Sequence, residues 1–430
     1  MRRTVIGMLV FLLVSSAGMT ADARPDDDRY VLDLSDVRLE TDGIQRLTGE
    51  WAFWWGRFID PAADTLPDAD GTISIPGVWN GGEGYGSYAR IIRLPSDTDE
   101  LALFIPPAST AYRLYVDGVP VAASGTPGVT KEESVPLYRI RTVRVRPRED
   151  RIRVVAHVSN FYHRRGGLWR PIIIGTPEDV ESWATVELVY DLFVAGGLFL
   201  MTLYLVALYG TGPRRSGSLT PLFAAAFFLS LAVRILVTGS MVATRVWTDI
   251  SWSTQLRIEY TGAHAALAAF VWLFRSAFPR RFSPWFAILV SGYAIANAVV
   301  ALVVPVSVYS RFVPIYALSM NGVFFVVTAV LVVAVIQRER YAGAYLGGAL
   351  LALLAAVGEA LQISPLFASR EMAPLSLVFR VAGSNSLSER TLQVMSIGGS
   401  LLLIFGSAAI IVLRTSGILF EQLSHTSAGS

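Results

Sequence analysis

Residues 186–210 read VELVYDLFVAGGLFLMTLYLVALYG, an apolar run with acidic side chains only in its first third. As an α-helix, this run is long enough to cross a hydrocarbon core of about 30 Å. Six further apolar runs of similar length follow and predict six more spanning helices. They occupy roughly 219–239, 258–278, 283–305, 313–336, 341–363 and 392–413. The sequence therefore predicts an all-α bundle of seven transmembrane helices over residues 183–413.

The composition of the whole chain agrees with membrane insertion. Of its 430 residues 53% are hydrophobic and only 16% are charged, whereas soluble proteins carry about 25% charged residues. The net charge is +2 and no basic tract resembles a nucleic-acid footprint, so we expect no nucleic-acid partner. The sequence contains no cysteine, which excludes disulfides, thiolate metal sites and cysteine nucleophiles.

Residues 1–23 have the pattern of a signal peptide. Arg2 and Arg3 precede an apolar stretch, Val5–Val14, that is too short to span a bilayer. The Ala-Asp-Ala sequence at 21–23 matches a cleavage site, and we expect the mature chain to begin directly after it. An uncleaved anchor helix is the alternative.

Residues 24–182 contain no spanning run and show the patterns of short strands. Along Arg151–Val158 apolar side chains alternate with a second, mostly polar set, which predicts a strand with one buried and one solvated side. Leu101–Ile105 and Tyr112–Val116 have similar patterns. Asp117–Gly118 is a hairpin turn signal, because both residues tolerate a positive φ. Many short strands separated by turns predict an all-β antiparallel sandwich.

Six short motifs follow one another in a fixed order through this segment. They are Gly49–Phe53, Ile75–Trp79, Gly84–Arg90, Ala111–Gly118, Val158–Phe161 and Arg165–Trp169. The ordered set resembles the sugar-binding jelly roll at the front of β-galactosidase-type glycoside hydrolases, over roughly residues 45–176. One departure is Asp117, where that family usually has asparagine. The resemblance implies a galactose-binding-like jelly roll that takes a carbohydrate.

Aromatic and polar side chains within these motifs, and in the loop between the last two, are candidates for ligand binding. Aromatic faces stack on sugar rings, and a few polar groups fix the orientation of a ligand. The candidate ligand-binding residues are Trp79, Tyr85, Tyr88, Asn160, His163, Arg165 and Trp169. Arg164 and Arg165 could also hold a carboxylate or phosphate. The alternative is structural: Trp51, Phe53 and Trp79 would then be core side chains, and the two arginines would be solvated.

We do not expect an enzyme. A glycosidase needs two carboxylates about 5 to 9.5 Å apart, whereas Glu132–Glu133 and Glu149–Asp150 are adjacent pairs whose side chains diverge. In the hydrolases that share the jelly roll, a separate barrel domain carries catalysis, and this sequence lacks it. The four histidines are not spaced like metal ligands, so we expect neither a metal nor a cofactor.

Two patterns predict the same membrane topology. Arginines are densest in the short loops after the first, third and fifth apolar runs, which places these loops on the cytoplasmic side. The signal peptide independently places the β-domain outside. We therefore expect a multi-pass protein of the bacterial inner membrane with a periplasmic N-terminal domain and a cytoplasmic C-terminus.

Polar side chains within the predicted spans gather in their outer half under this topology. These residues are Arg234, Glu259, His264, Asn297, Asn321 and Glu359. Because ionisable groups in lipid usually pair or face the bundle interior, we expect one polar cluster, with Arg234 paired to Glu259 or Glu359. Such a cluster would be a coupling site or a small-ligand pocket. The alternative is that Arg234 and Glu359 snorkel to the lipid headgroups.

Signal peptide, β-domain and seven helices in this order are similar to the bacterial seven-transmembrane receptors with diverse intracellular signalling modules. The jelly-roll motifs, the helix around Arg234 and the pair Glu259–Tyr260 carry this resemblance. It implies a periplasmic sensor domain, a membrane transducer and a C-terminal output such as a histidine kinase or nucleotide cyclase. Residues 414–430 form only a short cytoplasmic tail without such a motif, so we expect the signal to pass in trans to a separate cytoplasmic partner.

The sequence thus favours a receptor that senses a periplasmic, carbohydrate-like ligand and signals through its helices. One alternative is an envelope binding or scaffold protein that the helices only anchor. Another is a transporter, which is disfavoured because the two halves of the bundle show no repeat. Membrane lipids are an expected partner, and assembly into a homo-oligomer is left open.

Overall fold

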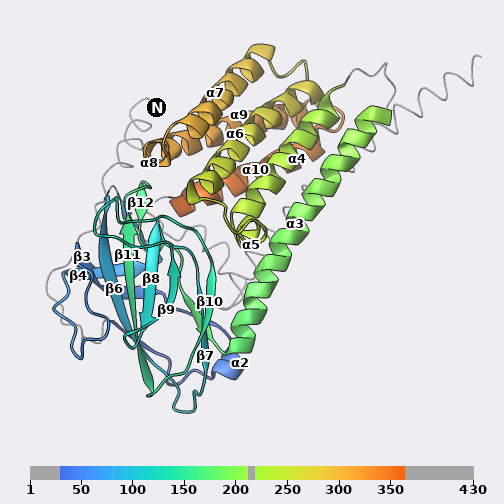
Figure 1. Cartoon of the computed structure of the whole chain (residues 1–430). Helices are drawn as coiled ribbons and strands as arrows, with labels where there is room; N and C mark the ends of the chain where they lie inside the picture. Colours follow the sequence, from blue (N-terminus) through green and yellow to red (C-terminus); the bar gives the residue numbers. More distant parts are fainter. Residues whose placement is uncertain (1–29, 81, 212–217, 364–430) are drawn as a thin grey trace, which may run out of the picture. The chain divides into compact units, whose positions relative to one another are not determined.

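The computed structural model describes residues 30–80, 82–211 and 218–363, which divide into two units (Figure 1). A β-rich unit ends at Glu181, and a helical unit covers Ser182–Ala360. The expected signal peptide, the seventh apolar run and the C-terminal tail lie outside the described residues.

The described part of the β-rich unit contains three sheets. The large sheet has the order β4–β3–β6–β11–β8–β9, with β1 added in parallel to β6. The second sheet has the order β10–β7–β13–β2, and the third pairs β12 with β5. The bounds are β1 Val31–Asp33, α2 Leu39–Asp42, β2 Gln45–Arg46, β3 Gly49–Trp55, β4 Gly71–Ile75, β5 Trp79–Asn80, β6 Gly84–Arg93, β7 Leu101–Ile105, β8 Ala111–Val116, β9 Val119–Ser124, β10 Arg141–Val145, β11 Arg151–Asn160, β12 Arg165–Gly166 and β13 Ile173–Gly175.

The core of this unit is built from both larger sheets. Trp51 of β3, Tyr88 of β6 and Leu103 of β7 have no exposed surface, and they belong to one cluster of buried side chains. Burying a large apolar side chain stabilises a fold by about 1.5–3 kcal/mol, so this cluster is the main source of stability. The expected β-rich domain is confirmed. The Asp117–Gly118 turn joins β8 to β9 with φ of 47° and 80°, as the hairpin signal predicts.

Strand β11 corrects one prediction. It lies between β6 and β8 in the large sheet, and both of its sides are covered. On the side expected to be solvated, Val155 is 0% and His157 only 8% exposed. Val155 packs in a second buried cluster with Tyr30 and Trp54. The alternation along β11 therefore separates two buried sides of different polarity.

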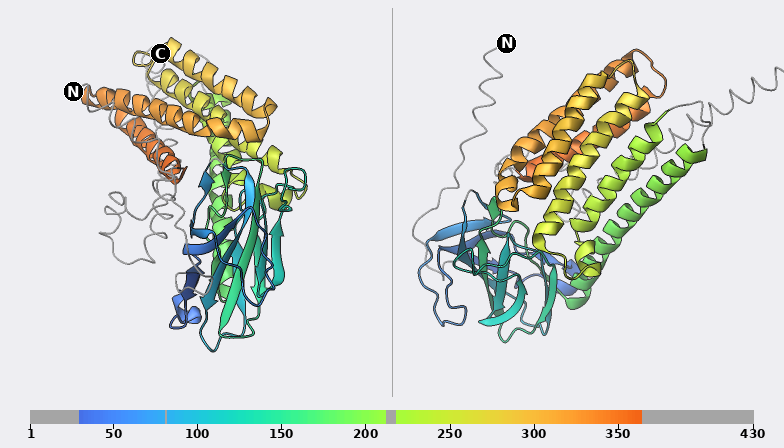
Figure 2. Two further views of the ribbon diagram at one scale, coloured as in Figure 1. Left: turned by 90° about the vertical axis from the view of Figure 1, so that its left-hand side faces the viewer. Right: turned by 45° about the horizontal axis from the view of Figure 1, so that its top comes forward.

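The helical unit is a bundle whose elements follow the predicted apolar runs. They are α3 Pro177–Thr211, whose first turn belongs to the β-rich unit, α4 Thr220–Val237, α5 Val242–Val246, α6 Trp252–Ala277, α7 Pro284–Val303, α8 Val306–Tyr309, η3 Ser310–Phe312, α9 Val313–Ile336 and α10 Ala342–Ile363. Helices α4, α6 and α7 lie alongside one another, coloured yellow-green to gold in Figure 2. Phe228, Phe270 and Ala287 are among the side chains buried in their common apolar cluster.

Four helical segments of the described chain are long and apolar enough to cross a membrane. They are Pro177–Thr211, Thr220–Val237, Pro284–Val303 and Val306–Ile336. Of the seven predicted spans, these four are confirmed as helices long and apolar enough to cross a membrane. Helix α10, Ala342–Ile363, covers the predicted run at 341–363, and its part Ala342–Leu354 is apolar.

The third predicted run differs most from the structure. Helix α6 begins at Trp252, six residues before the predicted start at 258, and it is more polar than the four candidate spans. Its neighbours explain this polarity: α6 contacts α4, α7, α8 and α9. A helix surrounded by other helices meets little lipid, so it can carry polar side chains that a lipid-facing helix cannot.

Candidate functional site

The predicted ligand-binding residues come together at one end of the large sheet. Here Asn160, the last residue of β11, lies opposite Gly84, the first residue of β6. Trp55, the last residue of β3, lies opposite Gly86. The β5–β12 pair adds Trp79, which lies opposite Gly166. We call this region, formed by the ends of β3, β11 and the start of β6 with β5 and β12, the aromatic end.

Trp79 and Tyr88 form the inner layer of the aromatic end. They are 8% and 0% exposed, and their rings stack with centroids 6.0 Å apart. Gly166 makes room for Trp79, because a Cβ at this position would lie 1.2 Å from the indole Nε1. A Cβ at Gly167 would lie 2.8 Å from the Tyr88 hydroxyl. The structure thus gives Trp79 the core position that was the alternative to ligand contact, and it buries Tyr88, which was predicted only as a ligand contact.

Trp55 forms the outer layer, and it is absent from the residues that the motifs predict. Its side chain is 40% exposed and meets Trp79 edge-on, with centroids 5.1 Å apart. A Cβ at Gly82 or Gly84 would lie 3.2 or 3.0 Å from the Trp55 ring, so these glycines let the backbone pass close to the indole. The period of two along β3 could have identified Trp55, because it shares a side with Trp51 at the last residue of the strand.

Two further predicted residues adjoin these elements in sequence: Tyr85 is the second residue of β6, and Trp169 follows β12 by three residues. Tyr85 is half-buried and packs against Phe58 with ring centroids 4.9 Å apart. Trp169 is also half-buried. Within the described residues, the indole Nε1 atoms of Trp79 and Trp169 are buried without a hydrogen-bond partner. Buried donors of this kind are costly unless water or a ligand satisfies them.

Asn160 and His163 shape the loop before β12. The side-chain amide of Asn160 donates to the backbone oxygen of His163 at 2.6 Å, and its Oδ1 accepts from the His163 N–H at 3.0 Å. The Arg165 N–H donates to Nδ1 of His163 at 3.3 Å. Burial and the charge of Arg164 lower the pKa of His163 to about 3, so the ring is neutral near pH 7. Ligand contact by Arg165, which this loop positions, stays a prediction.

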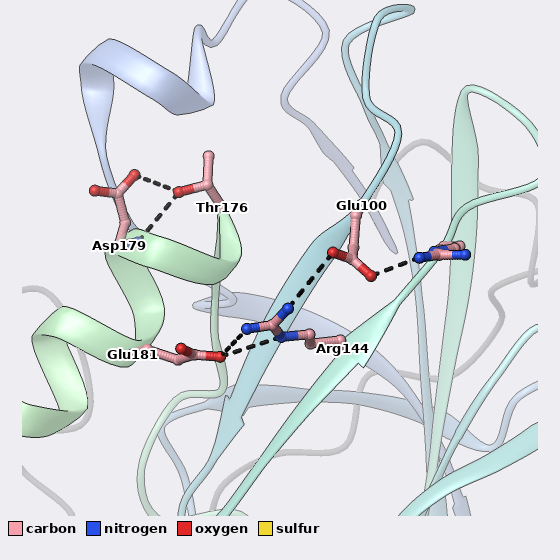
Figure 3. Close-up of polar contacts among 6 residues, drawn as sticks. Glu100, Arg144, Thr176, Asp179 and Glu181 are labelled. Atoms are coloured by element: carbon pink, nitrogen blue, oxygen red, sulfur yellow. Dashed lines mark hydrogen bonds and ion pairs between the residues drawn. The ribbon is translucent and has the colours of Figure 1, made fainter.

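A second group of polar contacts fixes the start of α3 to the second sheet (Figure 3). Oε1 of Glu181 accepts from Nε and Nη2 of Arg144 in β10 at 3.1 and 2.7 Å. Nη1 of Arg144 also lies 3.9 Å from Oε2 of Glu100. The Arg144 and Glu181 side chains are about half exposed, and exposed ion pairs contribute little to stability. Their effect is to orient the first turn of α3 on β10.

Thr176 caps the same helix. Its hydroxyl oxygen accepts from the Asp179 N–H at 3.2 Å, and the hydroxyl donates to Oδ2 of Asp179 at 2.7 Å (Figure 3). Val180, next in the chain, is fully buried. The Thr-x-x-Asp pattern before an apolar run is a recognisable helix start, but the prediction of a span from 186 did not use it.

In the helical unit, one expected ion pair is present. Nη2 of Arg234 in α4 lies 3.7 Å from Oε1 of Glu259 in α6. The Glu359 side chain lies outside the described residues. His264 is elsewhere: its Nε2 is hydrogen-bonded to the Tyr309 hydroxyl. Five residues separate Glu259 from His264, which rotates them about 140° apart around α6, so they form two groups and not the single cluster expected.

The two asparagines of the expected cluster, Asn297 and Asn321, make hydrogen bonds to other partners than those of Glu259 and His264. Nδ2 of Asn297 donates to the Tyr293 oxygen in its own helix at 2.9 Å. Nδ2 of Asn321 donates to the Ala317 oxygen at 2.8 Å and lies 3.5 Å from the Ala356 oxygen in α10. Asn321 thus links α9 to α10. Any function of these polar groups stays a prediction.

The described residues contain no group of histidines and carboxylates that could hold a metal ion. The residues of the aromatic end offer aromatic faces and hydrogen-bond donors. They suit non-covalent binding of a small polar molecule.

Among solved structures, β-galacturonidases and β-glucuronidases resemble part of the chain. A β-galacturonidase from Eisenbergiella tayi has 17% identity and a TM-score of 0.24, covering 31% of this chain and 24% of the enzyme. A β-glucuronidase from Bacteroides uniformis has 18% identity and a TM-score of 0.26, covering 30% of this chain and 17% of the enzyme. The chain thus spans only about a quarter or less of these enzymes' length. No curated protein matches the chain.

The helical part of the sequence matches the family model described as 7TM diverse intracellular signalling. The match covers residues 187–409, just over half of the chain. It includes all described residues of helices α4 to α10 and nearly all of the apolar part of α3. With four candidate membrane spans in the described residues, the chain is a multi-pass membrane protein. It belongs to the family of 7TM diverse intracellular signalling proteins, which are membrane receptors with a signalling role.

Proposed function

We propose that this receptor binds a carbohydrate-like ligand at the aromatic end of its β-rich unit. The observation that carries the proposal is Trp55. A large, 40% exposed indole beside a buried tryptophan and above two glycines is a flat apolar surface of the kind on which sugar rings stack. Arg165, on the strand next to Trp79, would supply the polar contact that orients a ligand.

The binding test uses the full-length protein in detergent and a panel of monosaccharides, glycan fragments and small carboxylates. A ligand at 100 times its Kd stabilises the folded state by about 2.7 kcal/mol, which raises the melting temperature by several degrees. We expect Trp55→Ala and Arg165→Gln to abolish the rise. Val119→Ala is the matched control, because Val119 is 52% exposed. It is the first residue of β9, directly after the Asp117–Gly118 turn, at the end of the large sheet opposite the aromatic end. A rise that survives Trp55→Ala would place the ligand elsewhere.

We further propose that seven helices span the inner membrane, with the β-rich unit in the periplasm. Six of the seven predicted runs coincide with helices of the described chain. A protein in the cytoplasm would receive the signal, in keeping with the intracellular signalling of the family. Ligand-dependent co-purification of a cytoplasmic protein would support this output, and constant association would favour a scaffold.

The absence of cysteine allows a clean topology test. Asp97 in the β-rich unit and Arg280 in the loop after α6 are both exposed, so each can be replaced by cysteine singly. In intact spheroplasts, a membrane-impermeant maleimide should label the Asp97→Cys variant at once. The Arg280→Cys variant should be labelled only after permeabilisation. The reverse pattern would invert the proposed topology.

A further inference from the structure

Helix α6 carries an unusual set of polar side chains near its start. In the described residues, Nε of Arg257, Oγ1 of Thr261 and Nδ1 of His264 are all buried and have no hydrogen-bond partner. Their spacing of four and three residues places them on one side of the helix. Buried polar atoms are nearly always bonded in folded proteins, so three unbonded atoms within two turns need an explanation.

Arg257 differs from the other charged side chains of this region. Arg234 is paired with Glu259 on the side of α6 that faces α4. Arg257 is half-buried, and the described part of the chain offers it neither an ion pair nor a hydrogen bond. A half-buried cation without a counter-charge is costly in a membrane protein. It would be stabilised by an anion from outside the chain.

His264 is held rigidly with one nitrogen available. The side chain is 1% exposed. Its Nε2 is bonded to the Tyr309 hydroxyl, and its ring meets Tyr316 edge-on with centroids 4.0 Å apart. When the Tyr309 hydroxyl donates to Nε2, the proton of the neutral imidazole lies on Nδ1. His264 then presents one N–H donor on the same side of α6 as the Arg257 guanidinium and the Thr261 hydroxyl.

We propose that Arg257, Thr261 and His264 form a binding site for a small acidic molecule. An oxyanion, either a carboxylate or a phosphate, binds the Arg257 guanidinium and the Thr261 hydroxyl by charge-assisted hydrogen bonds. Seven residues separate Arg257 from His264, about 10 Å along the axis. A bare ion cannot bridge this length, so a second polar group of the ligand accepts the hydrogen bond of His264 Nδ1.

The acid has two sources, a soluble metabolite or the headgroup of an anionic phospholipid. The soluble arm uses full-length protein in a neutral detergent and measures melting in sodium succinate and sodium citrate. The references are inorganic phosphate, a bare ion too short to bridge the site, and sodium chloride, all at equal ionic strength. The lipid arm compares nanodiscs of phosphatidylcholine with nanodiscs that also contain phosphatidylglycerol. We expect a rise of several degrees in at least one arm, and the arm that responds identifies the source.

Single substitutions test whether these residues hold the acid. Arg257→Gln and Thr261→Val should each raise the half-saturating concentration of the active probe at least tenfold. Arg275→Gln is the matched control, because Arg275 is also half-buried on α6 with an unbonded Nε. The residues four and seven positions before Arg275 are the apolar Val271 and Ala268. Arg275 therefore lacks the polar neighbours that Arg257 has in Thr261 and His264. Arg275→Gln should leave the response unchanged.

Two outcomes would overturn the proposal. One is that no soluble acid and no anionic lipid stabilises the wild-type protein. The other is that Arg257→Gln and Arg275→Gln weaken the response equally, as a general loss of positive charge would. The Trp55→Ala variant should retain the whole effect, so failure here is distinguishable from failure of ligand binding at the aromatic end.

Discussion

At the scale of single residues, Gly166 sets the packing of the aromatic end. A Cβ at this position would lie 1.2 Å from Nε1 of Trp79, and Trp79 is wedged among Phe53, Trp55 and Tyr88. We therefore expect Gly166→Ala to displace Trp79 and to destabilise the β-rich unit by about 3 kcal/mol or more.

The control for this prediction is another glycine. Gly43 has a φ of +69° and nothing within 4 Å of an added Cβ. Its ψ of −155° places it in a region of backbone conformation that is essentially restricted to glycine. Gly43→Ala therefore tests backbone strain alone, at about 1–3 kcal/mol. Melting followed by near-ultraviolet circular dichroism, which reports on packed tryptophans, should show the larger loss for Gly166→Ala. Equal losses would mean that Trp79 has room to move.

His163 should make the stability of the β-rich unit depend on pH. Burial and the charge of Arg164 lower the pKa of His163 to about 3, whereas an unfolded histidine titrates near 6.5. Between these values the unfolded chain holds a proton that the folded chain excludes. The stability present above pH 6.5 is therefore lost as the pH falls toward 3, by at most about 1.4 kcal/mol per pH unit.

Melting at pH 7.5, 6, 5 and 4 measures this dependence. Burial also lowers the pKa of His157, so the wild-type slope has two contributions of the same sign. His163→Gln should flatten the slope between pH 6 and 4, and the contribution of His157 should remain. Parallel curves for the two proteins would show that His163 is accessible to protons in the folded state.

The individual residues differ in how far the sequence could predict their roles. The ordered motifs and the loop between the last two indicated Trp79, Asn160 and His163, which the structure places at one end of the large sheet. Whether each side chain is a core residue or a ligand contact depends on the segments that cover it. The alternation along one strand does not predict those segments. The period of two along β3 indicates Trp55, which lies outside the motifs. Its close approach to Gly82 and Gly84 could not be predicted from β3 alone, because these glycines lie on another strand and its preceding loop.

At the scale of elements, the first turn of α3 depends on Thr176. Its hydroxyl satisfies the backbone N–H of Asp179, one of the donors that a helix start leaves unpaired. Thr176→Ala should destabilise this helix start by about 1 kcal/mol, and Thr176→Ser should retain the bond. Hydrogen exchange of the amides at 178–181 measures the effect directly. Similar exchange in both variants would mean that packing of Val180 holds the turn without the cap.

Helices and strands were predicted by different signals, which failed in different places. Hydropathy placed α9 at its observed bounds, because a lipid-facing helix is apolar along its whole length. It missed six residues at the start of α6, a helix enclosed by its neighbours. Arg257 lies in that missed segment, one residue before the predicted span. In β11 the alternation was present, but the cover on its second side comes from segments distant in sequence, such as Tyr30.

At the scale of the whole molecule, α3 is the element that belongs to both units. Its first turn is fixed to β10 by Glu181 and Arg144, and the helix is unbroken from Pro177 to Thr211. A span needs about 20 residues, so part of this 35-residue helix extends beyond the membrane core. If ligand binds to the β-rich unit as proposed, a continuous helix with a fixed first turn would be a physical route for the signal.

Softening α3 should therefore separate ligand binding from the response of the bundle. Ser182 and Val186 are exposed and lie one turn apart. Glycine at both positions weakens the helix by about 1 kcal/mol per residue relative to alanine. The response is read as the ligand-dependent change in maleimide labelling of the Arg280→Cys variant. We expect unchanged ligand affinity with a reduced response in the double-glycine protein, and a full response in the double-alanine control. A full response in both would mean that the signal reaches the bundle through other contacts, since a helix that bends at 182–186 transmits neither rotation nor translation of its first turn.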